Sequence, residues 1–385
     1  MIDYFSPLLN PDNYFESFHR IMQISGWKDS AQRFNLNLMR DIKHLIDEVE
    51  AGTYTPNLCN KFILSERGHL RLIKALTVRD SLLQHVLCNC VLIPHIRPKL
   101  IYDNGASLTD RGLSFARKRL EVHLHRHMAK YGTDGYILLL DFRKFFDNIP
   151  HKDLLNAYYS VIPDKRIIDL LAIILKKCDT DISYIKEPDE YQIIFSALDD
   201  FKVPDSLRTG TRYLHKGLAI GAPVSQISGV FYPSPIDNYC KIVRQCCAYG
   251  RYMDDIYIID RSKEHLFDVL AGIREQAEKL HLFVHPNKTH IVKLTHGFTW
   301  LKTKYVLTAS HGIIKRISRD NLIREKQKIK SLCELIKAGI IEPEILENQF
   351  KSWIGDKSFY HAYHSLKNLT NYYKEQLHYV IRYRR

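Results

Sequence analysis

The chain has 385 residues, 45% of them apolar and 26% charged, with a formal net charge of +13 at pH 7. These values are typical of a globular protein, and the length predicts two or three lobes. No stretch approaches the roughly 18 apolar residues of a membrane span, and the N-terminus lacks the pattern of a signal peptide, so we expect a cytoplasmic protein without membrane contact.

Positive charge is concentrated towards the C-terminus. From Lys302 to Arg385 there are 17 Lys and Arg against 8 Asp and Glu, so +9 of the formal +13 lies in this segment. Because neutralised phosphates release condensed counterions, this excess predicts a nucleic acid partner, with a solvated basic surface as the alternative. The eight cysteines form no CxxC pair, which predicts reduced thiols and no zinc site.

The first part of the chain predicts helices around one hairpin. In chain order the expected elements are an amphipathic helix over 30–52, capped by Ser30 and ended by Gly52, a hairpin over 60–77 split at Arg67-Gly68, and a helix over 79–96 ended by Pro94.

The remainder alternates strands with helices. The expected elements are a buried strand at Tyr136–Leu140, a helix near 166–178, a Gly-rich loop after 215, a helix over 263–282, a turn and strand in 285–295, a strand over 298–308, and a helix that places Leu322, Ile329, Cys333 and Ile336 on one face.

Two adjacent carboxylates, Asp254 and Asp255, stand between strand-forming residues in GRYMDDIYIID. Neighbouring residues of a regular strand point to opposite faces, so both reach one ligand only from a hairpin with MDD at its apex. Asp141, which ends the apolar strand 113 residues before Asp254, supplies a third carboxylate. Such oxygen ligands suit Mg²⁺, and two ions about 4 Å apart stabilise phosphoryl transfer. A solvated Asx turn and a strand-end cap are the alternatives.

Several further motifs occur in a fixed order around these carboxylates. They are GHLRLIKALTVRDSLLQHVL from 68, LIYDNGASLTDRGLSFARKRL from 100, DFRKFFDNIP from 141, GLAIGAPVSQ from 217, YMDD from 252, HPNKT from 285 and FTWLKTKY from 298. In order and spacing they resemble the fingers and palm motifs of the reverse transcriptases, and the stand-alone bacterial members in particular. The resemblance covers about residues 60 to 310, and the basic helical end resembles a thumb.

The resemblance implies a catalytic role for four residues. Asp141, Asp254 and Asp255 match the metal ligands, with the backbone carbonyl of Phe142 as a further oxygen. The implied cofactor is a pair of Mg²⁺ ions, with Mn²⁺ as the alternative ion. Lys288 matches a lysine that protonates the leaving pyrophosphate, and a surface lysine is the other interpretation.

The resemblance also implies contacts with nucleotide, primer and template. Phe146 matches an aromatic steric gate that excludes a 2′-hydroxyl, and we expect the adjacent Phe145 to be core. The other implied residues are Arg71, Lys74, Gly221, Ser225 and Gln226 for the nucleotide, and Tyr252, Met253, Trp300 and Lys302 for primer and template. The sequence departs from the family pattern at Ile220, where many relatives have Gln, and at Trp300-Leu301-Lys302, which replaces Phe-Leu-Gly.

The implied fold is α+β, a right hand with fingers, a palm with a small antiparallel sheet, and a helical thumb. We expect an N-terminal helical extension at 1–60, fingers at 61–135, a palm with part of the fingers at 136–310, and a basic helical thumb at 311–385.

The implied function is RNA-directed DNA polymerisation, a nucleotidyltransferase reaction that adds dNTPs to a primer 3′-hydroxyl on an RNA template and yields DNA. The fingers and the segment from 298 resemble defence-associated bacterial members most, which favours antiphage defence with a structured non-coding RNA template. A diversity-generating retroelement enzyme, a retron-like enzyme, an RNA-dependent RNA polymerase, a maturase-like splicing partner and a non-catalytic nucleic-acid-binding palm protein are the alternatives. The sequence does not decide which primer is used, whether an accessory protein is needed or whether the chain forms a homo-oligomer.

Overall fold

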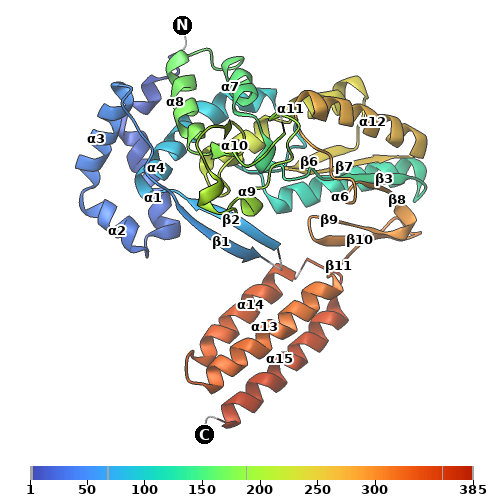
Figure 1. Ribbon diagram of the computed structural model, residues 1–385. Helices are drawn as coiled ribbons and strands as arrows, with labels where there is room; N and C mark the ends of the chain where they lie inside the picture. Colours follow the sequence, from blue (N-terminus) through green and yellow to red (C-terminus); the bar gives the residue numbers. More distant parts are fainter. Residues whose placement is uncertain (1–2, 67–68, 188, 358, 384–385) are drawn as a thin grey trace. The chain divides into compact units, whose positions relative to one another are not determined.

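The computed structural model describes residues 3–66, 69–187, 189–357 and 359–383 (Figure 1). Its α-helices, in chain order, are α1 (Pro11–Ser25), α2 (Asp29–Leu36), α3 (Leu38–Glu50), α4 (Val78–Val86), α5 (Ile93–Ile96), α6 (Leu113–Tyr131), α7 (His151–Tyr159), α8 (Lys165–Lys176), α9 (Ala197–Asp200), α10 (Pro223–Phe231), α11 (Ser234–Asn238), α12 (Lys263–Lys279), α13 (Arg319–Lys337), α14 (Pro343–Lys357) and α15 (Tyr363–Tyr383).

The strands are short and form small sheets. They are β1 (Asn60–Glu66), β2 (His69–Ala75), β3 (Tyr136–Leu140), β4 (Thr180–Asp181), β5 (Tyr213–Leu214), β6 (Tyr249–Tyr252), β7 (Asp255–Asp260), β8 (His290–Lys293), β9 (Phe298–Trp300), β10 (Thr303–Leu307) and β11 (Ile313–Arg316). Within the described ranges, the sheet orders are β1-β2, β4-β5, β6-β7-β3-β8 and β11-β10-β9. The predicted strand at Tyr136–Leu140 is confirmed at both ends.

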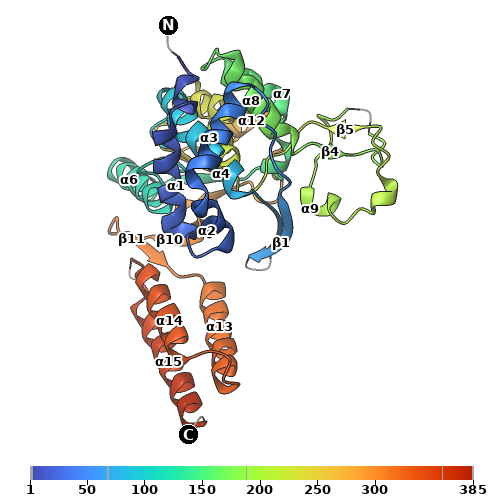
Figure 2. The same ribbon diagram turned by 90° about the vertical axis from the view of Figure 1, so that its left-hand side faces the viewer.

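The chain divides into two compact units. The first contains Met1–Arg119, Leu140–Ile258 and Glu264–His290, and the second contains Leu120–Leu139, Ile259–Lys263 and Ile291–Arg385. Within the first unit, β4, β5 and α9 form a group set apart from helices α1 to α4 (Figure 2). Every residue of the predicted catalytic set belongs to this first unit.

The predicted helix over 30–52 is wrong as a single element. The structure has two helices, α2 and α3, because Asn37 leaves helical geometry between them with φ −119° and ψ 22°. The helix start is also wrong, since Lys28 is the N-cap residue and Ser30 lies inside α2. The predicted stop is confirmed, because α3 ends before Gly52, which adopts φ +68°.

Helix α1 lies in the expected N-terminal helical extension, but its bounds were not predicted, although its start has a local signal. Asn10 accepts a hydrogen bond from the backbone N–H of Asp12 at 3.0 Å, and Pro11 takes the first helical position. An Asn followed by Pro marks a helix start, because the side chain satisfies one orphan donor and Pro needs none.

The hairpin over 60–77 is confirmed as β1 and β2, which pair in antiparallel register from Asn60↔Ala75 to Glu66↔His69. The predicted split at Arg67-Gly68 lies outside the described residues. The prediction that Pro94 ends the following helix is wrong, because α4 continues through a π-helical segment, Leu87–Leu92, into α5. Pro94 is the second residue of α5 and follows directly after the π-helical segment, so it lies within the continuous helix.

The C-terminal helices pack as a bundle within the second unit, with α13 against both α14 and α15 (Figure 1). The predicted apolar face of α13 is confirmed, since Ile329, Cys333 and Ile336 are buried in its core. The rings of Phe350 and Tyr373, from α14 and α15, stack at 4.1 Å. Apolar residues at three- and four-residue spacing thus face the bundle interior, as helix geometry requires.

The predicted single strand over 298–308 is wrong. It is a tight hairpin of β9 and β10, with Trp300 paired to Thr303 and the turn at Leu301 and Lys302. Both turn residues have positive φ, 44° and 64°. Glycine suits such positions, so Lys302 accepts a backbone strain on the order of 1 kcal/mol that a glycine would avoid.

Among the described residues, no helix combines the length and apolar character that crossing a membrane requires.

Candidate active site

The two adjacent aspartates lie at and beside a two-residue hairpin turn. Strands β6 and β7 pair antiparallel, with Tyr252 opposite Asp255, so Met253 and Asp254 form the turn. Met253 has φ +55°, the left-handed conformation that this turn type needs. The expectation of an MDD apex needs correction, because Asp255 is already the first residue of β7. The turn therefore carries Asp254, and the adjoining strand carries Asp255.

Asp141 follows β3 directly, and backbone pairing holds it in place. The N–H of His285 donates to the Asp141 carbonyl at 2.8 Å, and the N–H of Arg143 donates to the Phe283 carbonyl at 2.6 Å. Phe142 lies between these bonds and opposite Val284 in an antiparallel bridge. In such a pair the N–H and carbonyl of Phe142 point away from the partner strand, which leaves its carbonyl oxygen as a candidate ligand.

Lys288 contacts the Asp141 carboxylate. Its Nζ lies 3.0 Å from Asp141 Oδ2. The turn after Val284 brings the HPNKT motif back to Asp141, although the two residues are 147 positions apart. Lys288 therefore lies beside Asp141, a predicted metal ligand, which agrees with the position that the family resemblance implies for a proton donor.

Asp254 interacts electrostatically with both Asp141 and Lys288. Burial, followed by the neighbouring Asp141 carboxylate, raises the pKa of Asp254 to about 6, and Lys288 and Arg71 oppose this rise. Asp255 instead lies near Tyr252, whose pKa is raised by burial and to a smaller extent by Asp255. Within the described ranges, no three His, Cys, Asp or Glu side chains are grouped so that they alone could hold a metal ion. The structure thus brings together Asp141, Asp254 and Lys288.

The raised pKa of Asp254 predicts a pH-dependent stability. A carboxyl with a higher pKa in the folded chain than its ordinary 3.8 costs stability as pH rises from about 4 to about 6. Without divalent cations we expect Asp254→Asn to be more stable than the natural chain at pH 8, on the order of 1–2 kcal/mol after a discount for partial exposure, and equally stable below pH 4. Urea unfolding in chelator at both pH values measures this, and a pH-independent difference would contradict it.

A buried ion pair is hydrogen-bonded to the backbone of this turn. The side chains of Arg251 and Asp237 are both 0% exposed, and Nε and Nη2 of the arginine each donate to the carboxylate at 2.7 Å. The same guanidinium donates to the carbonyls of Met253 at 3.1 Å, Gly229 at 3.3 Å and Val230 at 2.7 Å. Sequence analysis missed this pair. The signal was present as a lone arginine in a strand of otherwise buried residues.

Phe146 lies in the segment that follows β3, and its ring is next to helix α10. Phe145 is 3% exposed, whereas Phe146 keeps intermediate exposure, so the two rings divide as core and partly open positions. The rings meet edge to face at 5.2 Å. The N–H of Leu218 donates to the Phe146 carbonyl at 2.8 Å, which ties the Gly-rich loop to this segment.

The Gly-rich loop ends at the start of α10. Gly221 has φ +102° and is exposed, and a Cβ there would meet only Ile73 of β2, at 4.0 Å. The buried Gln84 was not predicted, yet its Oε1 accepts from the N–H of Val224 at 3.3 Å and so caps α10. Of the two predicted polar contacts, Gln226 is exposed and Ser225 is buried. The exposed residues are therefore Gly221 in the loop and Gln226 in α10.

The two predicted basic residues of β2 lie on opposite faces of the strand. Arg71 acts on Asp254 through its charge and also pairs with Glu66 at 3.2 Å. Lys74, three residues on, instead lines a separate cavity of about 510 Å³ with Lys61 and residues of the 177–208 segment. Alternation along a strand explains the difference, since residues three apart point to opposite sides.

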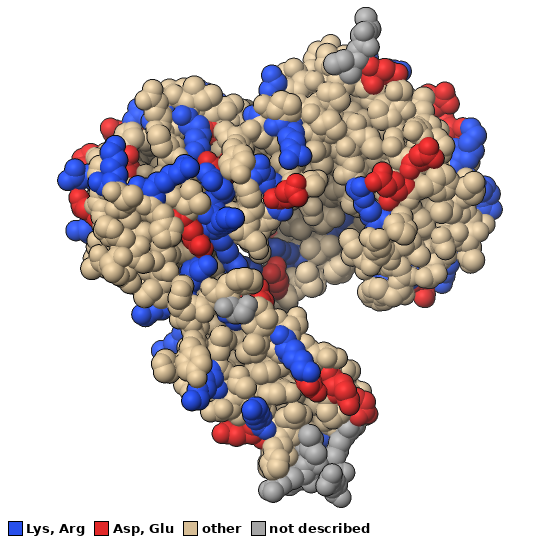
Figure 3. Space-filling model, turned by 180° about the vertical axis from the view of Figure 1, so that it is seen from behind, with Lys and Arg blue, Asp and Glu red and all other residues tan. Residues whose placement is uncertain are grey.

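The predicted primer contacts at 300 and 302 belong to the second unit. Trp300 is 4% exposed, so its ring packs inside the protein, whereas Lys302 occupies the β9–β10 turn. On the face shown in Figure 3, the bundle of α13, α14 and α15 carries Lys and Arg side chains with Asp and Glu side chains among them.

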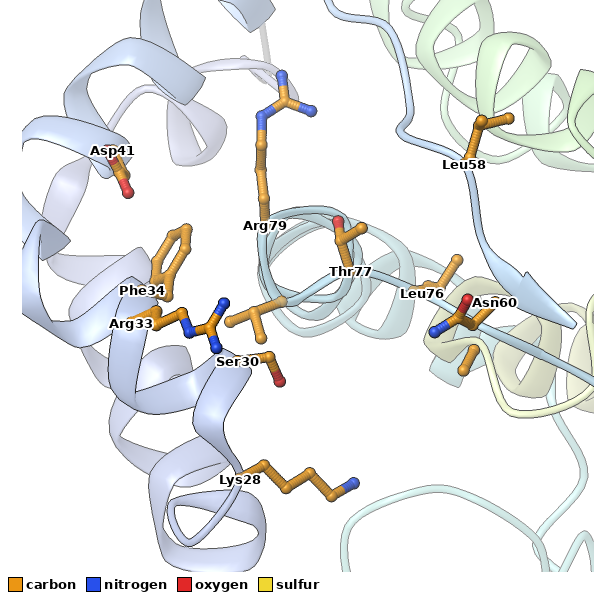
Figure 4. Close-up of a pocket in the computed structure, with 12 residues that line it drawn as sticks. Lys28, Ser30, Arg33, Phe34, Asp41, Leu58, Asn60, Leu76, Thr77 and Arg79 are labelled. Carbon is orange, nitrogen blue, oxygen red and sulfur yellow. The ribbon is translucent and has the colours of Figure 1, made fainter.

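A further cavity of about 590 Å³ lies beside α2 and the start of α4, and Figure 4 shows Arg33, Phe34 and Arg79 around it. None of the predicted site residues lines this cavity.

Comparison with known proteins identifies one family. A family model described as "Reverse transcriptase (RNA-dependent DNA polymerase)" matches residues 63–306, more than half of the chain. This range includes Arg71, Asp141, Asp254, Lys288 and the Gly-rich loop. No curated protein matches the chain.

Solved telomerase structures are similar to the chain at low identity. Telomerase from Candida albicans, in complex with a fragment of telomeric RNA, has 14% identity and a TM-score of 0.42 over 84% of this chain and 59% of its own. Two apo telomerase structures from Candida tropicalis have 11% identity, one with TM-score 0.45 over 68% of this chain and 56% of its own, the other with 0.44 over 88% and 67%. The chain thus spans somewhat more than half the length of the first two. The mixed helices, strands and small antiparallel sheets have the architecture of a right-hand polymerase.

Proposed function

Because the chain belongs to the reverse transcriptase (RNA-dependent DNA polymerase) family, we propose that it is an active RNA-directed DNA polymerase. In this proposal it adds dNTPs to the 3′-hydroxyl of a primer on an RNA template, with pyrophosphate as the leaving group. The products are DNA and pyrophosphate, so the partners are nucleic acid and dNTPs.

The observation that carries the proposal is the convergence of Asp141, Asp254 and Lys288. Burial, together with the carboxylate of Asp141 from a distant part of the chain, raises the pKa of Asp254, and the Lys288 ammonium lies 3.0 Å from Asp141. A structural turn has no need of two like charges beside each other. A site that binds cations and phosphate oxygens needs this arrangement.

The donor set fits divalent cations that are completed by substrate. Mg²⁺ binds through one or two carboxylates together with substrate phosphates and water, so a closed protein cage is not required. Asp141 and Asp254 would hold the ions, with the Phe142 carbonyl and Asp255 as further oxygens. When bound, the ions supply Lewis-acid stabilisation of the developing charge.

The chain's own residues supply the remaining functions. We propose that Lys288 donates a proton to the leaving pyrophosphate and that Arg71 contacts the triphosphate. Gly221 allows the backbone to approach the nucleotide, and Gln226 hydrogen-bonds the base or template. Lys302 and the basic bundle contact duplex phosphates.

Primer extension tests the proposed function directly. Purified protein is offered a primed RNA template and a primed DNA template, with dNTPs or rNTPs, with and without Mg²⁺. We expect extension with dNTPs, on RNA, only when the cation is present. Nucleic acid binding without extension under any condition would identify a non-catalytic binding protein instead, and extension with rNTPs alone would identify an RNA polymerase.

The partly exposed ring of Phe146 predicts sugar selectivity. We expect Phe146→Ala to raise kcat/KM for rNTPs relative to dNTPs by roughly 10-fold to 100-fold, because a ring under the sugar excludes a 2′-hydroxyl by steric overlap. Single-nucleotide incorporation with each substrate measures the ratio, and Phe145→Leu, a core change, is the matched control. An unchanged ratio for Phe146→Ala would assign the ring a packing role.

We further propose that the enzyme acts in a bacterial antiphage defence system with a dedicated structured RNA as template. The support is the likeness of the fingers motifs and of the segment from 298 to those of defence-associated bacterial relatives. Sequencing the RNA and cDNA that copurify with the protein tests this. One recurrent structured RNA with its complementary cDNA is expected, whereas cDNA copied from a variable coding region would point to a diversity-generating retroelement.

A further inference from the structure

Helix α10 contacts the ring of Phe146 at a glycine. A Cβ built on Gly229 would lie 3.0 Å from Cε1 and 3.1 Å from Cζ of Phe146, and 3.4 Å from Cε1 of Phe145. The first two distances are shorter than ordinary van der Waals contact. The ring therefore occupies space that any other residue at position 229 would take.

Position 229 is also fixed to the catalytic turn. Arg251 Nη1 donates to the Gly229 carbonyl at 3.3 Å and to the Met253 carbonyl at 3.1 Å, and Asp237 holds the guanidinium from the other side. One rigid, buried group thus joins the glycine under Phe146 to the turn that carries Asp254. The place of the ring relative to the turn is set through this connection.

We propose that Gly229 is a positioning residue for nucleotide selection: its missing side chain allows the Phe146 ring to lie back against α10 and leaves space for the deoxyribose. This inference rests on the proposed polymerase function and extends it to a residue that does not touch the substrate.

The direction of the effect follows from burial. Gly229 is buried in α10 and Phe145 is buried beside it, whereas Phe146 keeps intermediate exposure. A methyl group at position 229 therefore adds volume on the buried side of the ring. The ring has room to move only towards its open side, where the nucleotide sugar binds in this proposal.

The kinetic test is Gly229→Ala, alone and in the Phe146→Ala background. We expect Gly229→Ala to raise the KM for dNTPs by roughly tenfold with little change in kcat, because small misplacements at a substrate site are costly. In the Phe146→Ala background no ring is displaced, so the same substitution should change KM less than about twofold. Gly355→Ala is the matched control, since it also adds a methyl group to a helix but meets no atom within 4 Å.

Thermal unfolding tests the contact between Gly229 and Phe146 without any need for activity. The four proteins compared are the natural chain, Gly229→Ala, Phe146→Ala and the double variant. Alanine has a higher helix propensity than glycine, so Gly229→Ala should raise the melting temperature in the Phe146→Ala background. When the Phe146 ring is present, the same substitution should lower the melting temperature or leave it unchanged. Equal shifts in the two backgrounds, or an unchanged KM for Gly229→Ala, would overturn the inference. Inactivity of the natural chain would instead overturn the proposed function, and the melting data would still decide the contact.

Discussion

Replacing both turn carboxylates, Asp254→Asn with Asp255→Asn, should abolish primer extension while the fold survives. Asparagine keeps the shape and one acceptor oxygen of each side chain, but it removes the negative charge that holds cations. Since such ions contribute several kcal/mol to the stability of the transition state, we expect a rate loss of roughly 10³-fold or more.

Single-turnover extension on a primed RNA template measures this loss, and circular dichroism checks the fold. Asp260→Asn is the matched control, because Asp260 ends the same strand and accepts a hydrogen bond from the Ser262 N–H at 2.8 Å. The control should extend primers like the natural chain. Retained extension by the double variant would remove the metal assignment from this turn.

Replacing the buried Arg251 should give the largest loss of folding free energy among the variants described. In Arg251→Met, Asp237 is left as a buried carboxylate without its counter-charge, and three backbone carbonyls lose a donor. Breaking a buried ion pair from one side costs about 3–5 kcal/mol. We therefore expect a much lower urea midpoint, because the uncompensated charge favours the unfolded chain.

Two further variants identify the cause of that loss. The double variant Arg251→Met with Asp237→Leu removes both charges and should recover part of the stability, since apolar pairs of similar volume substitute well for buried ion pairs. Arg261→Met is the control, because its pair with Asp134 lies at 3.1 Å with side chains 65% and 56% exposed. It should cost less than about 1 kcal/mol. A double variant as unstable as Arg251→Met alone would show that the lost carbonyl contacts, and not the charge, dominate.

Local patterns predicted much of the secondary structure. The apolar run at Tyr136–Leu140 and the β1–β2 hairpin were confirmed, because strand alternation and continuous burial are visible in short windows. Two failures occurred where a chain segment changes direction without a strong breaker. Asn37 divides one predicted helix, and Leu301-Lys302 divides one predicted strand, although neither position carries glycine or proline.

The sequence by itself determined the order of the motifs and singled out Asp141 and Asp254 as candidate carboxylates. Asp141 follows a recognisable buried strand and Asp254 lies in a recognisable hairpin, so both are readable from their immediate neighbours. The family match over 63–306 includes both residues.

Only the tertiary structure decided which side chains support the site. The partnership of Arg251 with Asp237, the close approach of Gly229 to Phe146, and the opposite faces of Arg71 and Lys74 all depend on contacts between elements. Such contacts join residues distant in sequence, and their energy comes from burial and matched charge, which no local periodicity records. The local positions of Asp141 and Asp254 were therefore predictable from the sequence, and the residues packed around them were not.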